Sequence, residues 1–359
     1  MTPTNATDNW PADLSSRRLL EALSVPAFLV DSSRRVAITN SAARGLLGEA
    51  IEGRDLVFAL RDPKVLASVD AALAGAPTDG CEWAPAGRTQ RIFEVQTRPL
   101  TKTGSNVTAA LVTFSDITLA REAERVRSAF VSNVSHELRS PLSTLISAIE
   151  TLMTTARDDT QAQARFLGLM ETEAQRMHRL VDDLLSLSKL ETLEHIAPSD
   201  LVDLGPAMHE VARALAERAH ERNMTIDVRA PDSLPSIAAD RDELIEVLDN
   251  LIDNAIKYGD MGTTITVEAV VHDRVPELGR AGVRLSVHNR GDPIPPEHLP
   301  RLTERFYRAD KSRSRALGGT GLGLAIVKHI VNRHRGRLIL ESTADLGTRI
   351  TVLLALDPS

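Results

Sequence analysis

Three polar residues in the stretch DELIEVLDNLIDNAIKYG are spaced so that they could hold a metal–phosphate group. Asn250, Asn254 and Lys257 follow one another at intervals of four and three, so they share one face of the predicted helix. Carboxamide oxygens are hard ligands suited to Mg²⁺, and an ammonium group offers a point charge to phosphate. A solvated helix face is the simpler alternative, so this pattern alone does not decide between the two.

Two later segments could complete a nucleotide site. Asn289 ends a predicted strand just before Gly291, where an amide could contact a nucleobase edge and glycine lets the backbone approach closely. A tight turn without a ligand is an equally simple alternative. A predicted amphipathic helix begins directly after a loop that contains Gly318, Gly319, Gly321 and Gly323. The flexible backbone N–H donors of this loop and the helix N-terminus are together suited to bind phosphate. No Lys-Ser/Thr follows these glycines, so the loop is not a Walker motif. The order of all three segments favours a nucleotide site.

A different chemistry is suggested by the stretch FVSNVSHELRSPLSTLISAIETL, residues 130–152. Its apolar residues recur at spacings of three and four, which is the stripe of an amphipathic helix packing on other helices. His136 and Glu137 lie off that stripe and are predicted to point toward water. Pro141 stands in the helix interior, where a proline removes one hydrogen bond and favours a kink. An isolated histidine on a helix is most often a plain surface residue.

Taken together, these segments resemble the sequence boxes of sensor histidine kinases. The order DNLIDNAIKYG, NRGDPI, ERFYR, GGTGLGLAIVKHI and GTRI resembles their N, G1, F, G2 and G3 boxes, and FVSNVSHELRSPLS resembles their H box. The match covers about residues 119–355, roughly two thirds of the chain. The segment ending in TFSDIT resembles a PAS domain. RLTERFYRADKSRSRALGGTGLGLAIVKHIVNRH and LVDDLLSLSKLE are most similar to the phosphate-regulon sensor kinases, which implies a role in phosphate-starvation signalling.

The resemblance implies a role for each matching residue. His136 would accept a phosphoryl group from ATP, and Glu137 would orient the imidazole and take its proton. Asn250 and Asn254 would bind Mg²⁺, Lys257 would meet phosphate, and Asn289 would read the adenine amino group. Phe306 would cover the site from the lid. The other nucleotide-site residues implied are Tyr258, Gly291, Gly319, Thr320, Gly321, Leu322, Gly323 and Thr348.

The implied cofactors are ATP and Mg²⁺. The implied partners are a second copy of the chain, in a homodimer, and a response regulator whose receiver-domain aspartate takes the phosphoryl group from His136. Two departures from the family pattern carry expectations of their own. Asn289 replaces the usual aspartate, so we expect weaker ATP affinity, because an amide accepts from adenine without a charge. Ser140 stands where phosphatase-competent members commonly have Thr or Asn, which puts phosphatase activity in question.

Two other functions stay open at this point. An ATPase of the Hsp90, gyrase and MutL kind shares this nucleotide fold but uses a glutamate to activate water where Asn250 stands, and an amide cannot act as that base. A non-catalytic dimeric signalling scaffold with a decayed kinase domain is the second. His136, Asn250 and Asn254 argue against the scaffold, while Asn289 keeps it open.

The elements that must position these residues fall into three predicted domains, so the fold class is α+β multidomain. After a disordered N-terminus over residues 1–14, a PAS-like α/β sensor domain is predicted over 15–117, with two strands in 26–40, a helix at 41–47 and three later strands in an antiparallel sheet. A helical hairpin is predicted over 118–195. It cannot bury both its apolar stripes alone, so a dimeric four-helix bundle is expected, although packing on its own flanking domains is the alternative.

An α/β-sandwich ATP-binding domain of the GHKL type is predicted over 201–359. Its helices are expected near 207–221, 240–258 and 321–335, with five strands among them.

Composition limits the remaining function classes. A formal charge of −7 over 359 residues argues against direct nucleic-acid binding. The single cysteine, Cys81, excludes an intramolecular disulfide and a cysteine-rich metal site, and it fits a reducing compartment. No apolar run of about 18 residues predicts a transmembrane segment, and the first residues lack a signal-peptide core. We therefore expect a cytoplasmic protein. None of the 10 histidines precedes His136, which excludes a histidine-bound haem in the first domain.

Overall fold

The computed structural model describes residues 14–76, 78–85, 91–101, 107–157, 159–231, 234–310 and 319–356. Internal contacts divide the chain into two compact units, Met1–Ala129 and Phe130–Ser359. The predicted disordered segment 1–14 lies outside the described residues except for Leu14, and Gly318 lies outside them too. Among the described residues, no helix combines the length and the apolar character needed to cross a membrane.

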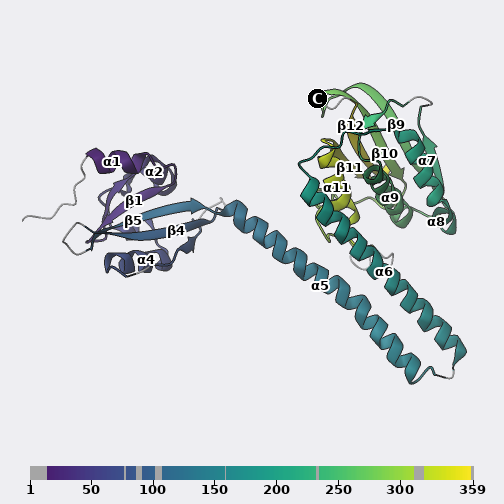
Figure 1. Cartoon of the computed structure of the whole chain (residues 1–359), viewed down its shortest axis with the longest axis horizontal. Helices are drawn as coiled ribbons and strands as arrows, with labels where there is room; N and C mark the ends of the chain where they lie inside the picture. Colours follow the sequence, from purple (N-terminus) through teal and green to yellow (C-terminus); the bar gives the residue numbers. More distant parts are fainter. Residues whose placement is uncertain are drawn as a thin grey trace, which may run out of the picture. The chain divides into compact units, whose positions relative to one another are not determined.

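The first unit contains the predicted antiparallel sheet, with five strands in the order β2-β1-β5-β4-β3. Figure 1 labels β1, β5 and β4 of this sheet. The strands are β1 Ala27–Asp31, β2 Val36–Thr39, β3 Cys81–Trp83, β4 Phe93–Thr101 and β5 Val107–Asp116. The predicted helix is confirmed as α2 Ser41–Leu47. Elements that the sequence did not reveal are α1 Leu14–Glu21, the short η1 Glu49–Ile51, α3 Leu56–Ala59 and α4 Pro63–Leu73.

Aromatic rings fill the interior of this unit. Phe28, Phe93 and Phe114 are buried on one face of the sheet, and Trp83 packs against Phe114 with ring centroids 5.5 Å apart. Helix α4 covers the same face with buried valines, while Leu20 of α1 packs on the opposite face. Because inward side chains alternate along each strand, the two faces of the sheet carry separate apolar clusters.

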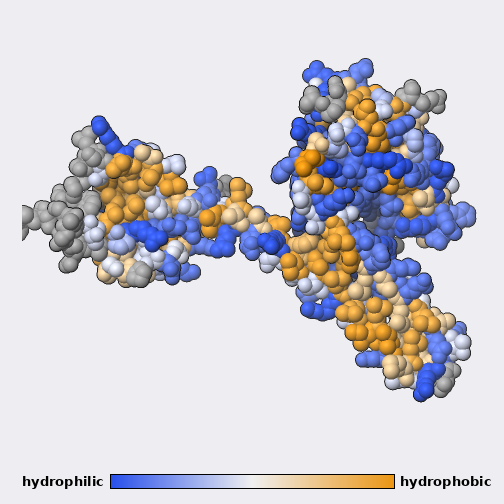
Figure 2. All heavy atoms as spheres, in the orientation of Figure 1, coloured by the Kyte–Doolittle hydropathy of each residue, from blue (hydrophilic) through white to orange (hydrophobic). Residues whose placement is uncertain are grey.

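Two long helices form the predicted hairpin: α5 Thr118–Met153 and α6 Thr160–Leu193. Helix α5 continues through Pro141, which is buried in its interior. Asp159 caps α6 by accepting hydrogen bonds from two backbone N–H groups of the first turn. Both helices keep large apolar side chains exposed, and Figure 2 shows an apolar surface along the hairpin. These side chains are Leu119, Val126, Val131, Leu142, Ile146, Ile149, Met153, Leu167, Leu169, Val181 and Leu185.

The rest of the second unit is an α/β sandwich. Its sheet has the order β11-β12-β10-β9-β7, in which β7 runs parallel to β9 and the other neighbours are antiparallel. The predicted strands are confirmed as β7 Thr225–Arg229, β9 Thr264–Val275, β10 Arg280–Asn289, β11 Arg337–Thr343 and β12 Gly347–Ala355. The helices are α7 Leu204–Ala214, α8 Ala216–Glu221, α9 Arg241–Tyr258 and α11 Gly323–Arg333, and smaller elements are β6 Leu201–Val202, β8 Ile237–Ala238 and η2 Leu299–Arg301.

Alternate residues of the central strands bury one face of this sheet against the helices. Ile265 and Val267 of β9 and Val283 and Leu285 of β10 share one core with the apolar residues of α7, α9 and α11. The core extends to α6, where Leu187 is buried. The predicted α/β sandwich is therefore confirmed, and the end of the hairpin packs directly on it.

Candidate functional site

A cavity of about 570 Å³ lies between α9, the end of β10 and the start of α11. This volume is typical of sites for small organic ligands. Ten of the predicted site residues line the cavity: Asn250, Asn254, Lys257, Tyr258, Asn289, Gly319, Thr320, Gly321, Gly323 and Thr348. Residues nearly 100 positions apart in sequence are thus brought to one cavity by the sheet and its helices.

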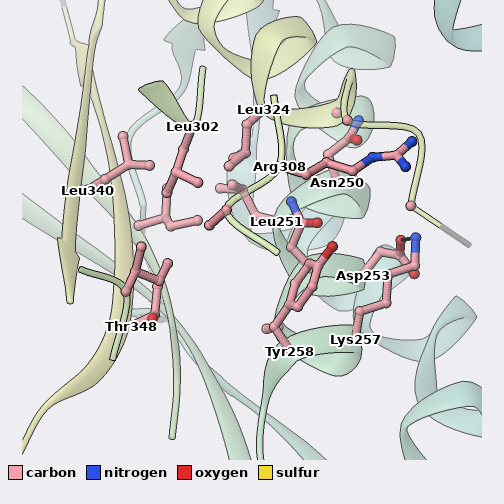
Figure 3. A pocket seen from close by; sticks show the side chains of 18 of the residues that line it. Asn250, Leu251, Asp253, Lys257, Tyr258, Leu302, Arg308, Leu324, Leu340 and Thr348 are labelled. Carbon is pink, nitrogen blue, oxygen red and sulfur yellow. Dashed lines mark ion pairs between the residues drawn. The ribbon is translucent and has the colours of Figure 1, made fainter. Parts of the chain in front are cut away.

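The cavity has an apolar end and a charged end (Figure 3). Leu302, Leu340 and Thr348 stand on one side of the view, and Arg308, Asp253 and Lys257 stand on the other, with Tyr258 between them. A nucleotide has the same division, since a nucleobase is a flat, weakly polar ring and the phosphates are highly charged. The lining therefore fits a nucleotide in one orientation, with the base among the leucines and the phosphates beside the cations.

At the apolar end, Asn289 is only 7% exposed, and its Nδ2 donates to the carbonyl of Arg290 (3.2 Å). It stands directly opposite Thr348 on the neighbouring strand β12. The Thr348 hydroxyl is in turn 2.9 Å from the Ser342 hydroxyl. These contacts fix two polar side chains at the predicted base position.

Asn250 is held in place by two features of the chain. Its Nδ2 donates to the Glu246 carbonyl one turn earlier (2.9 Å), which leaves Oδ1 as the acceptor atom of the amide. A Cβ atom added at Gly323 would lie 2.2 Å from that oxygen. Only glycine therefore lets the first residue of α11 approach the Asn250 side chain this closely.

At the charged end, Lys257 is paired with Asp253, with Nζ 2.6 Å from Oδ2 (dashed in Figure 3). The other Asp253 oxygen lies 2.5 Å from Nη2 of Arg218 on α8. Asp253 thus holds two cations at the cavity wall, and Arg218 also lines it. Sequence reasoning missed Asp253 and Arg218. The i to i+4 spacing of Asp253 and Lys257 was a usable signal, but nothing local pointed to Arg218.

Further carboxyl groups line the cavity, among them those of Asp183, Glu246 and Asp249. Burial raises the pKa values of Asp183, Glu246 and Asp249, and the charge of Asp253 adds to the effect at Asp249. A polyphosphate beside these carboxylates would be repelled without a cation. The residues present therefore fit a hard divalent cation, for which the amide oxygens of Asn250 and Asn254 are suitable ligands.

Three of the predicted nucleotide-site residues do not line the cavity. Leu322 is completely buried below the start of α11. Gly291 supports the wall from behind, since a Cβ there would lie 2.8 Å from the Tyr258 carbonyl oxygen. Phe306 was expected to cover the site, but its ring packs on Phe130 of α5, with centroids 5.8 Å apart. Its neighbours, Tyr307 and Arg308, line the cavity instead.

His136 is exposed on α5, as predicted, and forms no hydrogen bond or ion pair within the described part of the chain. The expectation that Glu137 points freely to water is wrong. Its side chain is 22% exposed, and Oε2 accepts from Nη2 of Arg176 on α6 and from Nη2 of Arg308, both at 3.0 Å. Arg308 also donates to the Thr320 carbonyl (2.9 Å). One guanidinium thus joins the residue beside His136 to the cavity wall.

Residues 305–308 and 319–321 lie at the edge of the cavity and are called the lid below. Further contacts hold this lid against α6. The Thr320 hydroxyl donates to Asp183 (2.6 Å), and Arg305 pairs with Glu191. Neither contact was predicted. Thr320 and Asp183 are 137 residues apart in the sequence, and Arg305 and Glu191 are 114 apart, so no local spacing could indicate these contacts.

Three family models match the chain. They are the PAS fold over residues 20–122, the His Kinase A (phospho-acceptor) domain over residues 126–193, and the histidine kinase-, DNA gyrase B- and HSP90-like ATPase over residues 239–358. The second match contains His136 and the third contains the N-box helix α9. Each match coincides with one of the folded parts described above.

Relatives and solved structures agree with these matches. The phosphate regulon sensor protein PhoR of Pseudomonas aeruginosa is 36% identical over 241 residues, which are 67% of this chain and 53% of that protein. The sensor histidine kinase WalK of Bacillus subtilis is 36% identical over 239 residues, 67% of this chain and 38% of that protein. The chain thus spans about half or less of the length of both relatives.

A crystal structure of histidine kinase ThkA in complex with response regulator protein TrrA has the same fold. The TM-score is 0.52 at 20% identity, and the match covers 95% of this chain and 98% of that one. With its PAS fold, its phospho-acceptor hairpin and its ATPase-type sandwich in this order, the chain belongs to the PAS-containing sensor histidine kinases.

Proposed function

We propose that this protein transfers the γ-phosphoryl group of ATP to His136 and then to an aspartate of a response regulator's receiver domain. The observation that carries the proposal is the link through Arg308. This residue lines a cavity with one apolar and one charged end, and it also contacts Glu137, the neighbour of the exposed His136. This contact supports the proposal because it joins the cavity to the neighbour of the proposed acceptor within one compact unit.

The proposed reaction is an in-line displacement at the γ-phosphorus. A ring nitrogen of His136 forms the new P–N bond while the bond from phosphorus to the bridging β,γ-oxygen breaks, and ADP leaves with that electron pair. Glu137 takes the proton that the imidazole loses. In the second step a receiver aspartate attacks the phosphohistidine, and the imidazole leaves.

The nucleotide site would contribute positioning and charge. Lys257 and Arg218 would face the phosphates, Tyr258 and Asn289 the base, and Asn250 and Asn254 would hold Mg²⁺. The metal ion would neutralise charge on the phosphate oxygens. Asp253 keeps both cations in place, since its two oxygens pair with Lys257 and Arg218. Asp183 and Asp249 also line the cavity, and in their ionised form they would repel metal-free ATP.

We further propose a homodimer formed by the two hairpins. The supporting observation is the exposed apolar surface of α5 and α6, which includes Leu142 (48% exposed), Ile146 (49%) and Leu185 (65%). Burying a leucine of this size from water contributes about 1.5–3 kcal/mol. Two hairpins that pair these surfaces would form a four-helix bundle and bury the stripe that one hairpin leaves open.

For the signal, we propose phosphate starvation as the first input to test. The support is the 36% identity to PhoR of Pseudomonas aeruginosa, and WalK of Bacillus subtilis matches at the same identity, so a WalK-type input is the competing proposal. Incubation of the phosphorylated protein with purified receiver domains of both regulator types discriminates between them. The cognate domain should take the label within seconds to minutes, and the other should take it far more slowly.

The primary test uses γ-labelled ATP with Mg²⁺ on the wild type and on His136→Gln. Acid-labile label on the wild type and none on the variant is the expected result. Label that survives acid, or that persists in His136→Gln, would refute His136 as the acceptor. Release of inorganic phosphate without any labelled protein would favour the ATPase alternative. A folded dimer with neither label nor phosphate release would favour the non-catalytic scaffold.

A further inference from the structure

We infer that Arg176 of α6 is a positioning residue for the phosphoryl transfer: it holds the Glu137 carboxylate in the orientation that serves His136. This inference rests on the proposed function, because it assigns a purpose to Glu137 only if Glu137 takes a proton from His136. It adds a residue outside every sequence segment that pointed to catalysis, and the evidence is geometric.

Arg176 carries a charge in a buried position on α6. It is 8% exposed, although charged side chains are seldom buried unless they are paired. Its Nη2 lies 3.0 Å from Oε2 of Glu137 on the facing helix. Its Nη1 lies 3.8 Å from Oε2 of Glu173, one turn earlier on α6. The guanidinium therefore lies between two carboxylates, with a hydrogen bond to Glu137 and a longer ion-pair contact to Glu173.

Among the described residues, Glu137 has two arginine partners, and they belong to different parts of the molecule. Arg308 comes from the lid of the nucleotide cavity, where it also donates to the Thr320 carbonyl. Its Nε is buried without a hydrogen-bond partner among the described residues, so this guanidinium is incompletely satisfied where it stands. Arg176 is on the same helical hairpin as Glu137. Any movement of the sandwich relative to the hairpin would break the Arg308 contact and keep the Arg176 contact.

This difference makes Arg176 the constant partner of Glu137. A glutamate on a helix surface can adopt several rotamers, and a base must lie within hydrogen-bond reach of the proton it removes. An ion pair at one carboxylate oxygen restricts rotation about the side-chain bonds and so orients the other oxygen. Because the pair is only partly exposed, screening by water is weaker than at an open surface pair.

The test is a double-mutant cycle on the full-length protein, with autophosphorylation and thermal unfolding measured in parallel. The variants are Arg176→Gln, Glu137→Gln and the double variant, with Arg241→Gln as the control. Arg241 also pairs with a glutamate, Glu210, but both side chains are about half exposed and lie away from the cavity lining. Arg176→Met keeps the aliphatic stem and replaces the glutamine variant if that variant does not fold.

The expected result is a fall in kcat of about tenfold for Arg176→Gln, part of the 10²–10⁴ that a positioned base supplies, with KM for ATP unchanged. In the Glu137→Gln background the Arg176 substitution should cost little more, because there is no base left to position. Arg241→Gln should leave both constants at the wild-type values.

Two results overturn the inference while leaving the proposed function standing. They are an unchanged kcat in Arg176→Gln, and a fall of kcat that is equally large with and without Glu137. The second result would mark Arg176 as a purely structural residue, with unfolding midpoints lowered alike in both backgrounds. Absence of acid-labile label on the wild type would instead refute the proposed function, and the inference with it.

Discussion

Gly323→Ala is the substitution for which the structure gives the most definite consequence. Gly323 is the first residue of α11 and lies against the amide of Asn250, a proposed ligand of Mg²⁺. The added Cβ would lie 2.2 Å from Oδ1 and 3.3 Å from Cγ of Asn250. An ordinary carbon–oxygen contact is about 3.4 Å, so the two groups must separate by about 1.2 Å.

The separation has two costs. Asn250 can move only by giving up its hydrogen bond to the Glu246 carbonyl (2.9 Å), since its side chain is short. Overpacking of this kind destabilises by about 1–3 kcal/mol. The larger effect is on activity, because a misplacement of about 1 Å at a positioning group can reduce a rate by about 10²-fold. We therefore expect a folded protein with about one hundredth of the wild-type autophosphorylation rate.

The assay is the initial rate of acid-labile labelling of His136, measured over a range of Mg²⁺ concentrations. Gly205→Ala is the matched control, since Gly205 is also in the first turn of a helix of the same sandwich, and an added Cβ meets only ordinary contacts at 3.5 and 4.0 Å. It should label at the wild-type rate. Wild-type labelling by Gly323→Ala would refute the reasoning, because the Asn250 amide would then be free to move without consequence.

Three further outcomes are expected. Leu185→Glu should convert the proposed dimer to a monomer in sedimentation equilibrium, because Leu185 is 65% exposed on the hairpin. Leu201 is 74% exposed but lies outside the hairpin, so Leu201→Glu should leave the dimer intact. Burial raises the pKa of Asp183, so the charged form of this carboxyl opposes folding. The stability that the neutral carboxyl allows is therefore lost as pH rises through the folded-state pKa of Asp183. Asp183→Asn should therefore melt above the wild type by a margin that is larger at pH 7 than at pH 4, and an equal margin would contradict this. Burial lowers the pKa of His334, so the wild type should lose stability to urea as pH falls below about 6.5, and His334→Gln should lose less over the same range.

Much of the candidate nucleotide site could be predicted because its signals are local. Asn250, Asn254 and Lys257 lie on one face of α9 through helix geometry alone, and the structure places all three on the cavity wall. The glycines before α11 could be read in the same way, since a helix start without side chains suits a close ligand. The strands of both sheets followed from their apolar periodicity, and the hairpin from its stripes.

The contacts between the hairpin and the sandwich could not be predicted. Arg176 and Glu137 are 39 residues apart, and Arg308 and Glu137 are 171 apart, so no periodicity relates them. The sequence pattern placed Glu137 on the polar side of α5, and that was right, but a polar side can face a partner as well as water. The family resemblance implied that Phe306 covers the cavity, and nothing local showed that its ring would pack on Phe130 of α5.

The sequence by itself thus determined which residues could do the chemistry and which helices and strands carry them, because side-chain type and spacing act over a few residues. Only the tertiary structure decided which charges are paired. The packing of the helices and the lid places Asp253 between Lys257 and Arg218. The same packing places Glu137 between Arg176 and Arg308. The physical reason is range: an ion pair of two long side chains forms within about 4 Å, and only the fold brings distant segments that close.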